Sequence, residues 1–177
     1  MTIRGVLLIL AALLGAGVAA EEKPAAPPAV PLINARTPLP GVLSGGQPTE
    51  EQIGLAARAG YRTVINLRTD QERGFEWERH AVETSGMTYA QIPIDGASGL
   101  TRANAERLDH ELERALESGP VLLHCASGNR VGALLALRAA WLEGVDPEKA
   151  LQLGRDAGPT GLEGTTRELL ERAPATP

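Results

Sequence analysis

The sequence contains one cysteine, Cys125, and three histidines among its 177 residues. A lone cysteine cannot form an internal disulfide, which excludes the disulfide-stapled scaffolds that are common among small exported proteins. The histidines, which are His80, His110 and His124, are not spaced as metal ligands. We therefore expect no metal site and no cofactor. Cys125 is either a small buried apolar side chain or a reactive thiol.

Runs of basic residues are also absent. The 17 lysines and arginines are outnumbered by 22 aspartates and glutamates, which gives a formal net charge of −5. An acidic chain of this kind is a poor partner for nucleic acid and for anionic lipid. The sequence shows no internal repeat, and its length is typical of a single domain.

Residues 1–20 are typical of a signal peptide. Arg4 supplies a positive charge, residues 6–14 form an apolar run, and Val18 and Ala20 are small enough to flank a cleavage site. The apolar run is too short to span a bilayer. We expect an exported protein, periplasmic or secreted, with no integral membrane span after cleavage before Glu21. The alternative is an uncleaved membrane anchor.

Residues 21–40 are rich in proline and alanine and lack apolar periodicity, which predicts an extended tether. We therefore place the folded domain at residues 41–172 and a disordered tail at residues 173–177. Within the domain, the short apolar segment 41–44 predicts an edge strand.

Strands and helices are predicted to alternate along this domain. Segments 61–67, 87–94 and 121–124 are apolar or β-branched and predict strands. Capping residues and helical spacing predict helices at about residues 49–60, from about residue 72, and at 101–118, 131–144, 146–155 and 162–173.

This alternation predicts an α/β fold, a single domain with a mainly parallel four- to five-stranded sheet and helices on both faces. The wholly apolar segment 121–124 is typical of a strand buried on both faces. Ligands of such sheets bind at the carboxyl ends of the strands. Cys125, which directly follows this strand, falls at that edge.

The segment after this strand reads CASGNR and carries the candidate chemistry. Gly128 lets the loop turn, and Arg130 begins the next helix. The loop N–H groups can point inward and bind an anion together with the positive end of the helix. The predicted substrate-binding residues are Ala126, Ser127, Gly128 and Asn129.

Such surroundings favour the thiolate form of Cys125. Arg130 can hold two oxygens of a phosphate group. We therefore predict that Cys125 is a nucleophile placed beneath a bound oxyanion. The alternative is a cysteine that only packs in the core.

Asp95 is the predicted general acid. It follows the strand 87–94 and begins a glycine-containing turn, and the ends of parallel strands gather at one edge, so it can meet Cys125. An Asx turn with Gly96 is the alternative role. Asp70, after the strand 61–67, is the alternative acid. Its neighbour Arg68 is interpreted as a solvated charge, with substrate binding as the alternative.

His124 precedes the nucleophile and has apolar strand neighbours. We expect its ring to orient loop or backbone groups and to take no part in proton transfer. The alternative is a core histidine without a functional role.

The His-Cys…Gly…Arg loop after a strand, with an aspartate at an earlier strand end, resembles the protein tyrosine and dual-specificity phosphatase superfamily. The runs SGGQPTEEQI and AGYRTVINLR, and the strand ending in IPI, more closely resemble a bacterial phosphatase-like family. That family is related to the phosphatase-like domain of β-lactamase-hydrolase-like proteins, and the resemblance extends from residue 41 to about residue 158. It implies that Cys125 attacks phosphorus, Arg130 and the loop amides hold the oxygens, and Asp95 protonates the leaving group. Water then releases a cysteinyl phosphate.

Two features depart from the superfamily pattern. Four residues separate Cys125 from Arg130, where the superfamily has five, which removes up to ~3.3–3.6 Å of chain. Val131 lies where the superfamily usually has a serine or threonine. A loop of this length is also found in rhodanese-type sulfurtransferases, in which Cys125 would carry a persulfide. The Asp-Val-Arg strand and Gly-His-Ile turn of that family have no match here.

We therefore predict a phosphatase that hydrolyses phosphate monoesters through a cysteinyl phosphate. Its expected partner is a phosphorylated small molecule or a phosphoprotein, and we expect a monomer. A rhodanese-like sulfurtransferase and a non-catalytic exported anion-binding module are the alternatives.

Overall fold

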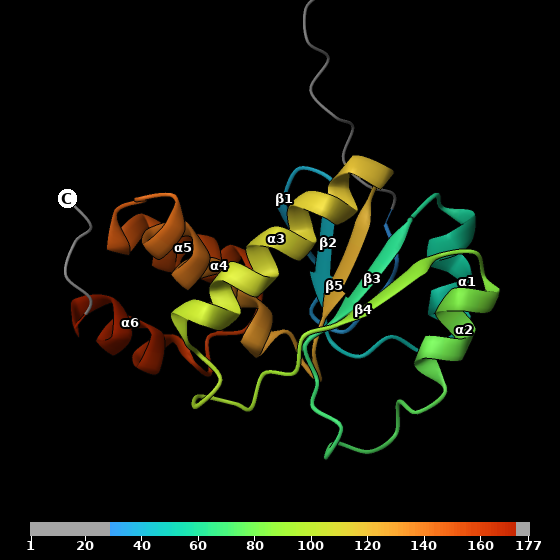
Figure 1. Cartoon of the computed structure of the whole chain (residues 1–177), viewed down its shortest axis with the longest axis horizontal. Coiled ribbons are helices and arrows are strands. Elements are labelled where there is room, and N and C mark those ends of the chain that lie inside the picture. The colour runs from blue at the N-terminus through green and yellow to red at the C-terminus, as the bar shows by residue number, and fades with distance from the viewer. Residues whose placement is uncertain (1–28, 173–177) are drawn as a thin grey trace, which may run out of the picture.

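Five short strands form one sheet in the order β1-β2-β5-β3-β4 (Figure 1). The computed structural model describes residues 29–172, so the predicted signal peptide, the first part of the predicted tether and the predicted tail lie outside the described residues. The strands are β1 (Arg36–Leu39), β2 (Val42–Gly45), β3 (Thr63–Asn66), β4 (Thr88–Gln91) and β5 (Val121–His124). β1 is antiparallel to β2, and the other pairs are parallel, which confirms the predicted α/β class.

Six helices of the described region cover the two faces of the sheet. They are α1 (Glu50–Arg58), α2 (Glu78–Thr84), α3 (Arg102–Ser118), α4 (Asn129–Leu142), α5 (Pro147–Ala157) and α6 (Glu163–Arg172). Figure 1 shows α1 and α2 on one side of the sheet and the other four on the opposite side. Thr49, Thr101 and Asp146 cap α1, α3 and α5, because each side-chain oxygen accepts a hydrogen bond from a backbone N–H of the first turn.

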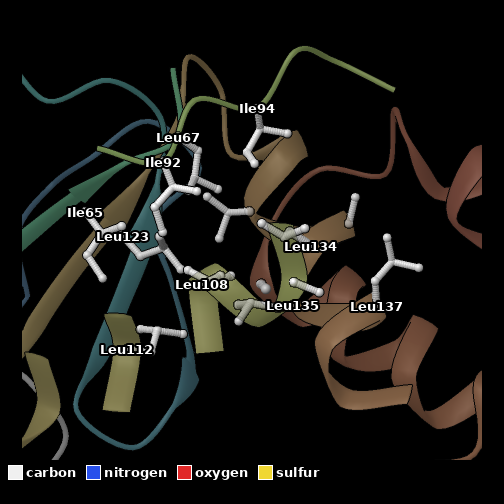
Figure 2. Close-up of a cluster of buried hydrophobic side chains, with 14 of the residues drawn as sticks. Ile65, Leu67, Ile92, Ile94, Leu108, Leu112, Leu123, Leu134, Leu135 and Leu137 are labelled. Carbon is white, nitrogen blue, oxygen red and sulfur yellow. The ribbon is translucent and has the colours of Figure 1, made fainter. Parts of the chain in front are cut away.

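Successive side chains of β5 point to opposite faces of the sheet, and the side chains on each face pack in a different hydrophobic cluster. Val121 and Leu123 belong to the larger cluster with α3 and α4, whereas Leu122 belongs to the cluster under α1 and α2. Figure 2 shows side chains of the sheet, α3 and α4 meeting in the larger cluster. The helix predicted at residues 131–144 is confirmed as α4, which has eight buried residues. Cys125 therefore lies at the end of the strand that both clusters hold.

The structure describes residues 29–40 of the predicted tether, and the prediction of a tether is wrong for these residues. Val30 and Leu32 are only 2% and 7% exposed and pack in the cluster under α1 and α2. Residues 36–39 then form β1, so β2 is an inner strand and the predicted edge strand at 41–44 is also wrong. The prediction failed because it rested on the proline-rich composition of the whole segment. Burial of the two apolar side chains outweighs the entropy cost of ordering the segment.

The helix predicted from about residue 72 begins instead at Glu78. In the preceding loop, the Glu72 carboxylate accepts the backbone N–H of Thr69 and the guanidinium groups of Arg68 and Arg130. These contacts hold residues 69–77 in a loop across the carboxyl ends of the strands. No helix of the described region is long and apolar enough to cross a membrane.

The neighbours Leu32 and Ile33 test whether segment 30–35 belongs to the domain. Leu32 is 7% exposed and Ile33 is 62% exposed. We expect Leu32→Ala to lower the free energy of unfolding by about 2–3 kcal/mol because it leaves a cavity. Ile33→Ala, the matched control, should change it by less than about 0.5 kcal/mol. Urea denaturation measures both, and equal small effects would show that the segment does not pack in solution.

Candidate active site

Cys125 follows β5 directly and is buried, with 1% of its surface exposed. Its backbone N–H donates to the Gly45 carbonyl of β2, which extends the sheet by one residue. Its sulfur accepts the N–H of Gly128 at 3.1 Å. This backbone N–H points into the loop, which is the direction that the predicted anion-binding arrangement needs.

Gly128 gives the loop its turn. It has a φ of +94°, which side-chain-bearing residues rarely adopt, and a Cβ there would lie 3.0 Å from Pro159. α4 begins at the next residue, so the positive end of its dipole lies at the loop. The short loop and the helix start therefore both depend on glycine at this position.

The carbonyl groups of the loop are bound from outside. The Ala126 carbonyl accepts the backbone N–H of Gln47 at 3.1 Å, and the Ser127 carbonyl accepts the side-chain amide of Asn34 at 3.0 Å. Asn129, which was predicted to bind substrate, turns its side chain to the Ser127 hydroxyl and the Gly161 N–H. The side chain of Asn129 is thus engaged in bracing the loop against the segment between α5 and α6.

Arg130 lies in the first turn of α4 and forms a bidentate ion pair with Glu72. Its Nη1 and Nη2 lie 2.5 and 2.9 Å from the two carboxylate oxygens, and Nη1 also donates to the Ile94 carbonyl at 3.0 Å. The hydrogen bonds between the two side chains raise the pKa of Arg130, with a further contribution from nearby Cys125, and lower the pKa of Glu72 to about 2.

The hydrogen bonds from Arg130 to Leu67, Glu72 and Ile94 all use Nη1 or Nη2, and the guanidinium also interacts with the Cys125 side chain. Because Glu72 binds the guanidinium end-on through Nη1 and Nη2, the edge formed by Nε and one Nη2 hydrogen points away from Glu72. A guanidinium edge of this kind matches two oxygens of a phosphate. The ion pair therefore fixes Arg130 and leaves it an edge for an oxyanion.

Glu72 was not predicted from the sequence, because it lies in a polar segment with no motif around it. Its Oε2 also accepts Arg68 Nε at 3.0 Å. Arg68 is only 8% exposed, stacks 4.4 Å from the centre of the Phe75 ring and donates to Gln47 Oε1. The interpretation of Arg68 as a solvated charge is therefore wrong.

Asp95 lies on the exposed loop before α3, directly after the Ile94 carbonyl that binds Arg130. Its Oδ2 accepts the Ser98 hydroxyl at 2.9 Å. Asp70 instead accepts the Gln91 side-chain amide at the edge strand β4. Of the two predicted acids, Asp95 follows a residue that contacts the guanidinium, whereas Asp70 faces the outer strand.

His124 is fully buried behind the loop. Its Nδ1 lies 3.3 Å from the Cys125 carbonyl, and its Nε2 lies 3.0 Å from Glu78 Oε1 without a hydrogen bond in the described region. Glu78 is also fully buried and accepts the side-chain amides of Gln47 and Asn66 at 2.9 and 2.7 Å. Glu78 had no signal in the sequence beyond its place in a polar segment.

Gln47 joins the two polar groups around the loop. Its side-chain oxygen accepts a hydrogen bond from Arg68, and its side-chain nitrogen donates one to Glu78. Its backbone N–H donates to the Ala126 carbonyl. The result is a continuous series of polar contacts from Arg130 to His124. Removing one member would leave buried partners unsatisfied, so these side chains hold one another in place.

The surface beside Glu72 is hollowed by about 280 Å³. Its lining residues are Asp70, Glu72, Phe75, Glu76, Arg79, Tyr89 and Gln91. Within residues 29–172, no cluster of three or more histidine, cysteine, aspartate or glutamate side chains is arranged to hold a metal ion.

The family model described as "DSP-PTPase phosphatase fused to NAD+ Kinase" matches residues 39–167. The dual specificity protein phosphatase TpbA of Pseudomonas aeruginosa is 30% identical over 157 residues, which are 82% of this chain and 69% of that protein. A beta-lactamase hydrolase-like protein of Xylella fastidiosa is 38% identical over 96 residues, which are 52% of this chain and only 22% of that protein.

The crystal structure of TpbA superposes with a TM-score of 0.64 at 21% identity, covering 81% of this chain and 86% of that chain. At this level of identity the superposition supports the fold alone.

The pair of Glu72 and Arg130 predicts how stability changes with acidity. Because the pKa of Glu72 falls from 4.5 to about 2 on folding, its stabilising contribution is complete above about pH 4.5 and is lost as the pH falls toward 2. Glu72→Gln should therefore lose roughly 1–2 kcal/mol less stability than the parent over this range, after allowance for solvent around the pair. Urea unfolding near pH 5 and near pH 3 measures the difference, and parallel losses would contradict the ion pair.

Proposed function

The chain belongs to the DSP-PTPase phosphatase family, and on that basis we propose that it hydrolyses phosphate monoesters through a cysteinyl phosphate on Cys125. The observation that carries this proposal is the pairing of two donors around one nucleophile. The Gly128 N–H lies 3.1 Å from the sulfur, and Glu72 holds Arg130 through its two Nη atoms, so that the Nε edge points away from that carboxylate. A phosphate bound by this edge and by the loop amides would present its phosphorus to the sulfur.

In the first step, the Cys125 thiolate attacks phosphorus and the bond from phosphorus to the leaving oxygen breaks. The new bond joins sulfur to phosphorus, and the leaving oxygen takes a proton from the carboxyl group of Asp95. The place of Asp95 beside the Ile94 carbonyl, which Arg130 binds, supports this assignment over Asp70. Asp95 is exposed, so it can reach an alcohol that leaves toward solvent.

In the second step, water attacks the phosphorus of the cysteinyl phosphate. The Asp95 carboxylate accepts a proton from this water, and the bond from sulfur to phosphorus breaks to return the thiolate. Val131 is fully buried and has no hydroxyl to assist the departing sulfur. Stabilisation of the returning thiolate therefore falls to the Gly128 N–H and the end of α4.

We propose aryl phosphates as the first substrate class to examine. A cysteine-to-serine variant of TpbA has been solved in complex with pTyr, and that protein shares the fold of this chain. A phosphorylated small molecule or a phosphoprotein remains the proposed partner. We propose an exported site of action on the grounds of the N-terminal sequence.

Sulfur transfer is the second candidate, favoured by the four-residue spacing between Cys125 and Arg130. In that reaction the sulfur of Cys125 would accept a sulfur atom and pass it on without a general acid. A dependence of hydrolysis on Asp95 therefore separates the two functions.

Kinetics with two aryl phosphates test the proposal. Cys125→Ser should abolish turnover of p-nitrophenyl phosphate, because a serine hydroxyl is not ionised at neutral pH. Asp95→Asn should reduce kcat by roughly 10²–10⁴-fold for phenyl phosphate and by less for p-nitrophenyl phosphate, whose leaving group needs less protonation. Steady-state rates at several pH values measure both effects.

Asp70→Asn is the matched control and should keep kcat within about threefold of the parent. A larger loss in Asp70→Asn than in Asp95→Asn would reassign the acid. Full turnover by Cys125→Ser would overturn the cysteinyl phosphate, and a parent that transfers sulfur from thiosulfate to cyanide without hydrolysing either ester would favour the second candidate.

A further inference from the structure

Asn34 lies in the segment whose composition predicts a tether, yet it contacts the catalytic loop. Its side-chain amide donates to the Ser127 carbonyl at 3.0 Å, across 93 residues of sequence. Its backbone has a φ of +54°, and it is the one residue other than glycine with a positive φ in the described region. Asparagine tolerates this left-handed conformation better than most residues, but it remains a strained state that needs support from its surroundings.

That support comes from both sides of Asn34. Val30 and Leu32 anchor the segment in the core, and the Gln52 side chain donates to the Pro31 carbonyl at 2.7 Å. The Ile33 carbonyl accepts the N–H of Gly46 at 2.7 Å. A Cβ on Gly46 would lie 2.9 Å from the Ala126 carbonyl oxygen, so glycine permits the close approach between this segment and the loop. The strained residue is thus held directly against the candidate nucleophile loop.

The geometry of the peptide bond gives this contact a consequence. A trans peptide unit is planar, and its C=O and N–H point in opposite directions. The Ser127 carbonyl and the Gly128 N–H belong to one such unit. Asn34 holds the carbonyl on the outer side of the loop, and the N–H of the same unit is directed at Cys125 Sγ at 3.1 Å.

The preceding peptide unit is held in the same way. The Ala126 carbonyl accepts the Gln47 N–H, so the Ser127 N–H of that unit points away from Gln47. Gly128 itself does not fix the orientation of the unit before it, because glycine accepts a wide range of φ. An external hydrogen bond is therefore needed to select the orientation with the N–H toward the sulfur.

We propose that Asn34 is a positioning residue that orients the Ser127–Gly128 peptide toward Cys125 and the bound phosphate. This inference rests on the proposed function, since it assumes that the loop binds an oxyanion. Asn34 touches neither substrate nor sulfur in this role and acts through one peptide unit. The N-terminal segment thereby helps to support the phosphate-binding loop. This loop is shorter by one residue than the superfamily pattern.

Two substitutions separate the side-chain hydrogen bond from the backbone conformation. Asn34→Gly keeps the left-handed backbone at no steric cost and removes the donor. Asn34→Asp keeps the shape and also tolerates the backbone, but sets a carboxylate oxygen against the Ser127 carbonyl. Both variants are made in the full chain. Calorimetry measures the dissociation constant for inorganic phosphate, and steady-state assays with p-nitrophenyl phosphate measure kcat and KM.

We expect phosphate binding to weaken by roughly 3- to 10-fold in Asn34→Gly, the range of one lost hydrogen bond. Asn34→Asp should weaken it by more than about 10-fold, because repulsion turns the peptide away. The midpoint of thermal unfolding should be unchanged or higher in Asn34→Gly. A purely structural role would instead lower this midpoint together with phosphate binding. Gln52→Glu is the matched control, since it replaces an amide with a carboxylate at Pro31 of the same segment, and its phosphate binding should stay within about twofold of the parent.

Equal phosphate binding in the parent, Asn34→Gly and Asn34→Asp would overturn the positioning role and leave the proposed function intact. A loss in Gln52→Glu as large as in Asn34→Asp would also overturn it, because loosening of the whole segment would then explain both. A parent that neither binds phosphate nor hydrolyses the ester would overturn the proposed function and this inference with it.

Discussion

The hydrogen bond from the Gly128 N–H to Cys125 Sγ, at 3.1 Å, joins the candidate nucleophile to the loop and helix that follow it. It requires a cysteine at the buried end of β5, a glycine with a left-handed backbone, and α4 beginning at the next residue. The two hydrophobic clusters that meet at β5 supply the rigidity, because they hold both faces of the strand that carries Cys125. The site is therefore an extension of the most buried part of the sheet.

Charge is arranged around this contact in two groups. Arg130, Glu72 and Arg68 form a partly buried group with side chains 11%, 27% and 10% exposed, and Glu78 and His124 lie behind the loop with no exposed surface. Buried charges are costly unless they are paired and hydrogen-bonded, so each group stabilises a particular arrangement of its members more than the fold as a whole. Gln47 links the groups and also holds one loop carbonyl, which couples the direction of the loop amides to both.

Local patterns in the sequence predicted the elements that position Cys125. The apolar run at residues 121–124 coincides with β5, and the helices predicted at residues 101–118 and 131–144 are α3 and α4. Asn34, Glu72 and Glu78 were not predicted, because their partners are distant in sequence and a polar or proline-rich segment looks the same whether it is solvated or packed. The tether and the helix from residue 72 failed for the same reason: tertiary contacts of a few side chains outweighed composition.

The proposed mechanism depends on a covalent bond between phosphorus and the sulfur of Cys125. Acid-quenching the full chain during turnover of an aryl phosphate, followed by mass spectrometry of its peptides, tests this directly. The proposed mechanism predicts one phosphoryl group on Cys125 that is absent from Cys125→Ser. In Asp95→Asn it should accumulate with p-nitrophenyl phosphate, whose departure needs little protonation, because the water attack of the second step is slowed more. A phosphoryl group on another residue, or steady turnover by a protein whose Cys125 is alkylated, would contradict it.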